Sequence, residues 1–202
     1  MGRPRTHDEH TRVALLDVAE RIVEEDGLAA LSVRAAAAGA GTTTRAVYSL
    51  FGSKEGLLVA LSARAFEILN DGLDAQRSSG DPVADLVAAG TEVFRGLVRE
   101  HPWLYRLAFQ RAAPGLPLPA AFEVARWGSF ARVEQRVRRI EDAGLLGDRT
   151  VRQAAVEFQV VCEGLANAEL RGGTLRQLAP ADAGRAWADA HEAMIRGWAV
   201  AG

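Results

Sequence analysis

Apolar residues recur three or four positions apart along most of the chain, which is the spacing of one face of an α-helix. The first such segment covers about residues 11–27, and Gly27 suits the position just after a helix end. Two short helices are predicted at 32–38 and about 43–51, and a longer one follows Ser53. Hydroxyl side chains are suited to begin these three helices: Ser32, Thr42 or Thr43, and Ser53.

The remaining helices are longer and are separated by Pro- and Gly-containing breaks. We predict them at about 82–100, 102–111, 119–143, 148–171 and 181–200. Sustained alternation and Asn-Gly hairpin turns, the usual signs of strands, are almost absent. The pattern therefore predicts an all-α fold of about nine helices, with three short helices first.

Composition narrows the class of protein. The chain has 202 residues, of which 49% are hydrophobic, enough for a sizeable core. The single cysteine, Cys162, excludes an internal disulfide and suits a reducing cytoplasm. No apolar run approaches the roughly 20 residues of a membrane span, and the N-terminus lacks an apolar signal region. We therefore expect a cytoplasmic protein without a membrane partner.

Charge is segregated along the chain. The net charge is −2, yet residues 28–54 contain no Asp or Glu and include Arg34, Arg45 and Lys54. Two short helices joined by a Gly-containing turn suggest a helix-turn-helix, whose second helix enters a DNA major groove about 12 Å wide. A helix face without carboxylates suits this groove, because the groove is lined by negatively charged phosphates. A solvated helical hairpin is the alternative.

Residues 11–60 also resemble a known family. The pieces that match are the opening helix ending in Gly27, the stretch "LSVR", Ala37, Gly41 and above all "VYSLFGSKEGLL". They resemble the DNA-binding domain of the TetR family of bacterial transcription regulators. The resemblance implies a flexible basic arm at 1–10, a helix-turn-helix domain at 11–55, and a ligand-binding and dimerisation domain at 56–202.

The residues predicted to meet DNA follow from the pattern and the resemblance together. Arg45 suits guanine, and Tyr48 and Lys54 suit phosphates. Arg45 stands where members of the family often carry a small residue or proline. The operator sequence of a relative therefore does not predict the operator of this chain. The arm resembles minor-groove AT-hook segments, with a solvated tail as the alternative. The full set is Arg3, Arg5, Ser32, Arg34, Thr43, Thr44, Arg45, Tyr48, Ser49 and Lys54.

Aromatic residues gather in the second domain. Ordinary core packing explains most of them, whereas the resemblance implies an inducer pocket in this region. The candidate pocket residues are Trp103, Tyr105, Phe109, Trp127, Phe130, Phe158 and Cys162. This part partly resembles a TetR subtype named for a Trp-His-Gly motif, of which Gln159, Glu163 and Gly164 retain only the glycine.

Signs of catalysis are missing from the sequence. We find no HExxH, Walker, GxSxG or CxxC motif, so we predict no catalytic residues, no metal and no cofactor. His7 and His10 are expected to be solvated in the arm. His101 is expected at a helix boundary, and His191 near the surface or an interface.

We therefore expect a regulator, most simply a repressor, with three partners: a double-stranded palindromic DNA operator, an unknown small-molecule effector and a second copy of the chain. The resemblance implies that the last two helices form the homodimer interface, with packing within one chain as the alternative interpretation of their small residues: Ala154, Ala155, Gly164, Ala166, Ala168, Ala186, Ala190, Ala193 and Gly197. The alternatives are an all-α small-molecule-binding protein or enzyme, a helix-turn-helix used for protein contacts, and a TetR-like activator.

Overall fold

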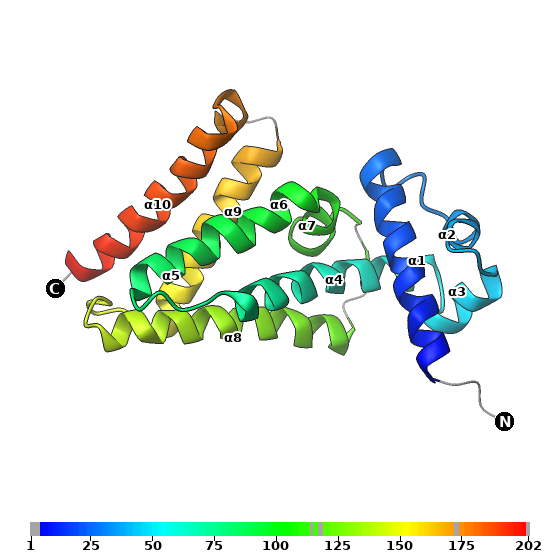
Figure 1. The fold of residues 1–202 in the computed structure, drawn as a ribbon, viewed down its shortest axis with the longest axis horizontal. Coiled ribbons are helices and arrows are strands. Elements are labelled where there is room, and N and C mark those ends of the chain that lie inside the picture. The colour runs from blue at the N-terminus through cyan, green and yellow to red at the C-terminus, as the bar shows by residue number, and fades with distance from the viewer. Residues whose placement is uncertain (1–4, 114, 117–118, 172–173, 201–202) are drawn as a thin grey trace. The chain divides into compact units, whose positions relative to one another are not determined.

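The computed structural model describes residues 5–113, 115–116, 119–171 and 174–200 (Figure 1). Every regular element within these ranges is helical. Because α5, η1 and α6 form one unbroken run, the described residues form nine helices and one 3₁₀ turn, which confirms the predicted all-α fold. In chain order the elements are α1 (Arg5–Asp26), α2 (Val33–Gly39), α3 (Thr44–Phe51), α4 (Lys54–Ala75), α5 (Pro82–Ala88), the π-helical turn η1 (Ala89–Phe94), α6 (Arg95–Glu100), α7 (Pro102–Phe109), α8 (Ala120–Asp142), α9 (Val151–Leu170), the 3₁₀ turn η2 (Thr174–Gln177) and α10 (Pro180–Val200).

Hydroxyl side chains begin three of the first four helices, as predicted. In each case the side-chain oxygen accepts the backbone N–H three residues ahead, at 3.1 Å for Ser32, 3.2 Å for Thr43 and 3.1 Å for Ser53. Such a cap stabilises a helix by about 1 kcal/mol. The boundaries of these helices therefore follow from local sequence.

The N-terminal helix begins earlier than the sequence predicts. Helix α1 starts at Arg5 instead of near residue 11, so the predicted arm at 1–10 is helical from Arg5 on. Asp8 lies in its first turn, where a negative charge is favourable. Residues 1–4, including the candidate Arg3, lie outside the described residues. None of the described helices is both long enough and apolar enough to cross a bilayer.

The chain divides into two compact units. The first contains residues up to Phe66 together with His101–Ala125, and the second contains Glu67–Glu100 and residues from Arg126 onward. The predicted boundary after residue 55 does not anticipate that residues 101–125 belong to the same compact unit as the first three helices. Helix α7 lies against α1, which is a long-range contact that local sequence does not encode.

The first unit is built around α1. Its buried side chains Leu15, Ala19 and Val23 meet Val47 of α3 in the core. Polar contacts fix α7 on α1, since the Trp103 amide donates to Glu24 Oε1 at 2.8 Å and His101 Nδ1 lies 2.5 Å from Glu20 Oε1. The predicted helix boundary at His101 is confirmed, because α7 begins at the next residue.

The second unit buries its largest side chains between α9, α10 and the run from α5 to α6. Trp187 and Trp198 of α10 are fully buried, and their indole N–H groups donate to Glu169 and Glu157 of α9. Glu169 also holds the buried Arg95 of α6 at 3.0 Å. Figure 1 shows α9 and α10 side by side, joined by these contacts.

The prediction for His191 is wrong, because this side chain is fully buried. Its Nδ1 donates to the Trp187 carbonyl at 2.7 Å, so Nε2 is left to accept from the Cys162 thiol, 3.2 Å away. Burial lowers the pKa of His191 and raises that of Cys162, so both groups are neutral at pH 7. Sequence spacing gave no sign that Gly90 of the π-helical turn leaves the room for this ring.

Candidate nucleic-acid interface

A tight turn joins α2 to α3. Gly41 has φ +62°, a conformation that side chains with a Cβ rarely adopt. The Thr42 amide then donates to the Ala37 carbonyl at 2.9 Å, closing the turn. Gly52, with φ +76°, ends α3 in the same way. The two glycines therefore fix the start and the end of the candidate recognition segment.

Helix α3 is anchored by one apolar face. Val47 is fully buried, and Ala36 and Ala37 of α2, the helix that α3 contacts, are buried as well. Phe51 is only half-buried, and the Arg12 guanidinium lies 6.0 Å from its ring centre. A helix of eight residues held in this way has its opposite face free for a partner.

The opposite face of α3 is exposed, as predicted. Thr44, Arg45, Tyr48 and Ser49 are all exposed, and 55% of Tyr48 is accessible despite its aromatic ring. Arg34 of α2 is exposed too. Within the described part of the chain, neither Arg34 nor Arg45 pairs with a carboxylate. Both guanidinium groups therefore retain their donors for an external acceptor.

Two hydroxyl groups at this surface, those of Ser32 and Thr43, also serve as helix caps. Because Ser32 and Thr43 accept backbone N–H groups through their oxygens, each still has its own O–H to donate. A phosphate oxygen is a suitable acceptor for such a hydroxyl. Capping and DNA contact are therefore compatible roles for Ser32 and Thr43.

The backbone N–H groups at the start of α4 favour an anion such as a phosphate. Lys54, beside them, is half-buried. The exposed Glu55 carboxylate binds there instead: its own backbone N–H and the Ser53 hydroxyl lower its pKa. Gly56 N–H is taken by Ser53. The Lys54 ammonium is therefore the group available to a phosphate at this point.

The seven candidate pocket residues divide between the two units. In the first unit, Tyr105 is buried and stacks on Phe109 at 4.9 Å between ring centres, while Trp103 is half-buried beneath the Arg106 guanidinium. Phe109 also contacts Phe66 at 5.0 Å. These contacts are those of an aromatic core, and a ligand cavity formed by these residues stays a prediction.

In the second unit the candidates differ in exposure. Phe158 and Cys162 are fully buried around His191, whereas 46% of Trp127 is accessible. Phe130 meets Trp127 edge-on at 5.9 Å, and the Arg126 guanidinium lies 4.4 Å from the centre of the Trp127 ring. Within this unit, the candidates therefore include both core positions and surface positions.

The small residues of the last two helices fall into three groups, of which the half-buried one contains Ala168, Ala186 and Ala190. Ala154, Ala155 and Ala166 are fully buried within the chain, so they serve the packing of the second unit itself. The exposed members are Gly164, Ala193 and Gly197, and a Cβ at either glycine would meet nothing within 4 Å. Next to them on α9, Val156 and Val160 are exposed apolar side chains. These exposed residues form a surface suited to a second helical partner.

Two family models match the chain. Residues 15–61 match the model described as "Bacterial regulatory proteins, tetR family", and residues 86–194 match one described as "Tetracyclin repressor-like, C-terminal domain". The HTH-type transcriptional regulator Rv1816 of Mycobacterium tuberculosis is 29% identical over 121 residues, which are 59% of this chain and 52% of that protein. The chain therefore spans about half the length of the curated relatives it matches.

Solved structures are similar over nearly the whole chain. A protein of unknown function from Rhodococcus sp. RHA1 superposes with a TM-score of 0.79 at 25% identity, covering 94% of this chain and 95% of that one. NalD of Pseudomonas aeruginosa, the secondary repressor of the MexAB-OprM multidrug efflux pump, has a TM-score of 0.66 at 26% identity, covering 96% and 98%. The similarity extends over both compact units.

Proposed function

Because the chain belongs to the TetR family of transcriptional regulators, we propose that it is a ligand-responsive repressor that binds a palindromic DNA operator as a homodimer. One observation carries the proposal: the exposed face of α3 presents Arg45 and Tyr48, and residues 28–54 contribute no carboxylate to that surface. The direction of regulation is supported by the likeness to NalD, which is a repressor. Such a protein works in the cytoplasm, where the bacterial chromosome lies.

The residues divide their work between sequence and backbone. Arg45, with Thr44 and Ser49 beside it, contacts base edges in the major groove. Tyr48, Lys54 and Arg34 hold phosphates, and the hydroxyl groups of Ser32 and Thr43 donate to phosphates from the helix starts. Arg3, which precedes α1, and Arg5, the first residue of α1, would contact the adjacent minor groove.

A homodimer follows from the size of the site. One recognition helix of eight residues reads only a few base pairs, so two copies related by a two-fold axis are needed for a specific operator. The exposed strip of Val156, Val160 and Gly164 on α9, with Ala193 and Gly197 on α10, is the surface on which we propose that the second copy packs. Glycines without neighbours allow helices to approach closely.

Ligand control would act through α4. Only Gly52 and Ser53 separate α4 from the recognition helix, so a displacement of α4 moves α3 and changes the distance between the two half-site contacts. Helix α7 offers a second route, since Glu20 and Glu24 of α1 hold its start. An effector shifts this equilibrium only if its affinity differs between the two states.

Selection of bound sequences from a random DNA pool tests the proposal. The purified chain should enrich a palindrome with half-sites about one helical turn apart, roughly 10 base pairs from centre to centre. The Arg45→Ala variant, selected in parallel, should enrich a palindrome that is degenerate at one position of each half-site. A pool that remains random for the unmodified chain would contradict the proposal.

A further inference from the structure

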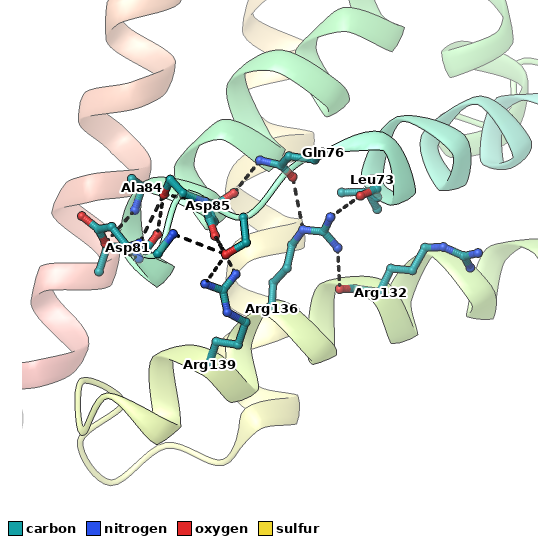
Figure 2. A network of polar contacts seen from close by, with 12 residues as sticks. Leu73, Gln76, Asp81, Ala84, Asp85, Arg132, Arg136 and Arg139 are labelled. Atoms are coloured by element: carbon teal, nitrogen blue, oxygen red, sulfur yellow. Dashed lines mark hydrogen bonds and ion pairs between the residues drawn. The ribbon is translucent and has the colours of Figure 1, made fainter.

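A polar network joins the end of α4, the loop at 76–81, the start of α5 and the middle of α8 (Figure 2). Asp85 lies at its centre and is almost fully buried. Four hydrogen bonds reach its carboxylate: the Ser79 amide at 2.8 Å, the Ser79 hydroxyl at 2.6 Å, the Ser78 hydroxyl at 3.0 Å and Arg139 Nη1 at 2.6 Å. This carboxylate is therefore saturated.

The other carboxylate in this region is also occupied. Asp74, in the last turn of α4, receives two bonds from Arg132, at 2.8 Å from Nε and 2.6 Å from Nη2. Such a bidentate pair uses both carboxylate oxygens. The pairing lowers the pKa of Asp74 and raises that of Arg132. Asp74 thus gives its hydrogen bonds to Arg132, and it acts on Arg136 only through its charge.

Arg136 lies between these two ion pairs and has only neutral acceptors. Its guanidinium donates to Gln76 Oε1 at 3.2 Å, to the Arg132 carbonyl at 3.2 Å and to the Leu73 carbonyl (Figure 2). The side chain is half-buried, and burial lowers the pKa of Arg136. Three hydrogen bonds leave two of its five N–H groups without an acceptor among the described residues.

Arg77 adds a second guanidinium group that forms no ion pair among the described residues. It is exposed in the loop after α4, and no described residue pairs with it. Arg77, Arg136 and Arg139 together line a cavity of about 240 Å³, whose wall also contains the amide donor Gln135. Since both carboxylates in the wall are paired, the cavity presents an excess of positive charge and of hydrogen-bond donors.

We propose that this cavity, here named the arginine pocket, binds a small anion through a phosphate or carboxylate group. Arg136 would supply a fork of two donors to the anion, and Arg77 would cover it from the loop. A volume of 240 Å³ lies below the roughly 300 Å³ at which pockets for drug-sized ligands begin, so the ligand is a small organic acid or phosphate ester. The proposal goes beyond DNA binding and is independent of it.

Hydrogen bonds of Arg136 and Arg139 also hold the loop, so a variant at either residue changes folding and binding together. Arg77 separates the two effects, because it makes no described contact whose loss would destabilise the chain. Arg138 is the matched control, because it is an exposed arginine of α8 next to Arg139 in the sequence and does not line the pocket.

Calorimetric titration of the full chain, without DNA and in a buffer of low ionic strength, tests the proposal. Sodium phosphate and sodium succinate are the two probes, so that the preferred group is identified. We expect saturable binding of at least one probe, and Arg77→Gln should weaken it about fivefold, as is typical for a partly exposed charge contact. Arg138→Gln should leave the affinity unchanged.

Arg136→Gln provides the second measurement. Circular dichroism first checks that the variant is folded, and the titration should then show the larger loss of the two variants. The proposal is overturned if neither probe saturates the unmodified chain by about 10 mM, ten times a millimolar dissociation constant. It is also overturned if Arg77→Gln and Arg138→Gln weaken binding equally, because binding would then report only net charge.

Discussion

Gly90 lies directly against the imidazole of His191: a Cβ on residue 90 would stand 2.6 Å from Nε2. Gly90→Ala should therefore destabilise the chain by about 1–3 kcal/mol, the usual cost of overpacking a core. Urea unfolding measures this difference. Gly96→Ala is the control, because a Cβ there meets nothing within 4 Å and alanine favours a helix by up to about 1 kcal/mol. Equal effects of the two substitutions would contradict the argument.

The buried His191 predicts a pH dependence of stability. Burial lowers its pKa in the folded state, so below about pH 6.5 the unfolded chain binds more protons than the folded chain. The free energy of unfolding should fall as pH decreases below that value, by up to about 1.4 kcal/mol per pH unit. Unfolding in urea at several pH values measures the slope. His191→Gln should flatten it, and an unchanged slope would assign the effect to other groups.

The Asp85 carboxylate predicts a second, more acidic transition. Burial alone would raise its pKa, but hydrogen bonds from Ser79, Arg139 and Ser78 outweigh this and hold the pKa of Asp85 well below its usual value. The stability that this group contributes is present above about pH 4 and is lost as pH falls below it. Asp85→Asn should lower the free energy of unfolding by about 2–3 kcal/mol at pH 7, as expected for hydrogen bonds to a charged group. Below about pH 4 the variant and the unmodified chain should be equally stable, because the carboxylate of the unmodified chain no longer contributes.

Asp142→Asn is the control for this experiment, since Asp142 is an exposed carboxylate on α8 with no described partner. Asp142→Asn should change the free energy of unfolding little, both at pH 7 and below about pH 4. If Asp142→Asn lowered the free energy of unfolding as much as Asp85→Asn, the hydrogen bonds of Asp85 would not be the cause of the effect.

Arg45 and Lys54 should differ in how they affect DNA affinity. Arg45→Ala should reduce discrimination at one base position by about 1–3 kcal/mol, because a bidentate base contact is lost. Lys54→Gln should weaken all sequences alike and lower the slope of log affinity against log salt by about 0.9, the value for one phosphate contact. Fluorescence anisotropy with the selected operator and its single-base variants measures both. A uniform loss from Arg45→Ala would remove it from the base-reading set.

The exposed strip on α9 predicts the effect of a charge at the proposed dimer surface. Val160 is 63% accessible in the single chain. Val160→Glu would bring two carboxylates near the two-fold axis, so dimer dissociation should increase by more than about tenfold. Analytical ultracentrifugation measures it. Ala131→Glu on the exposed side of α8 should leave the dimer intact, and identical behaviour of the two variants would exclude this surface.

Local sequence was sufficient for most helices and for the exposure of the candidate DNA-binding residues on α3. Caps such as Ser32 and Thr43 act within one helical turn, and the burial of Val47 follows from spacing. The exposure of Arg45 follows from the same spacing. These features depend on neighbours three or four residues away, which periodicity records.

Features that depend on distant residues were missed. Arg136 meets Leu73 across 63 positions and Arg139 meets Asp85 across 54, so composition alone gave no sign of the arginine pocket. A signal was nevertheless present, because Arg132, Arg136 and Arg139 are spaced to share one helical face. Glu55 is the first carboxylate after the segment 28–54, and the hydrogen bond that it accepts from Ser53 depends on the local geometry of the helix start.

The π-helical turn sets the phase of the helix in which it lies. In an uninterrupted α-helix, the ten positions from Asp85 to Arg95 correspond to about 1000° of rotation, so the two side chains would point about 80° apart. One π turn accommodates an extra residue and removes about 100°, which turns them to nearly opposite sides. Asp85 accordingly meets Arg139 of α8, while Arg95 meets Glu169 of α9. The same residues in an uninterrupted α-helix would leave α6 rotated by about 100°, a little over a quarter of a circle, and would turn Arg95 away from Glu169, so the extra residue held in the π turn sets the positions of two ion pairs.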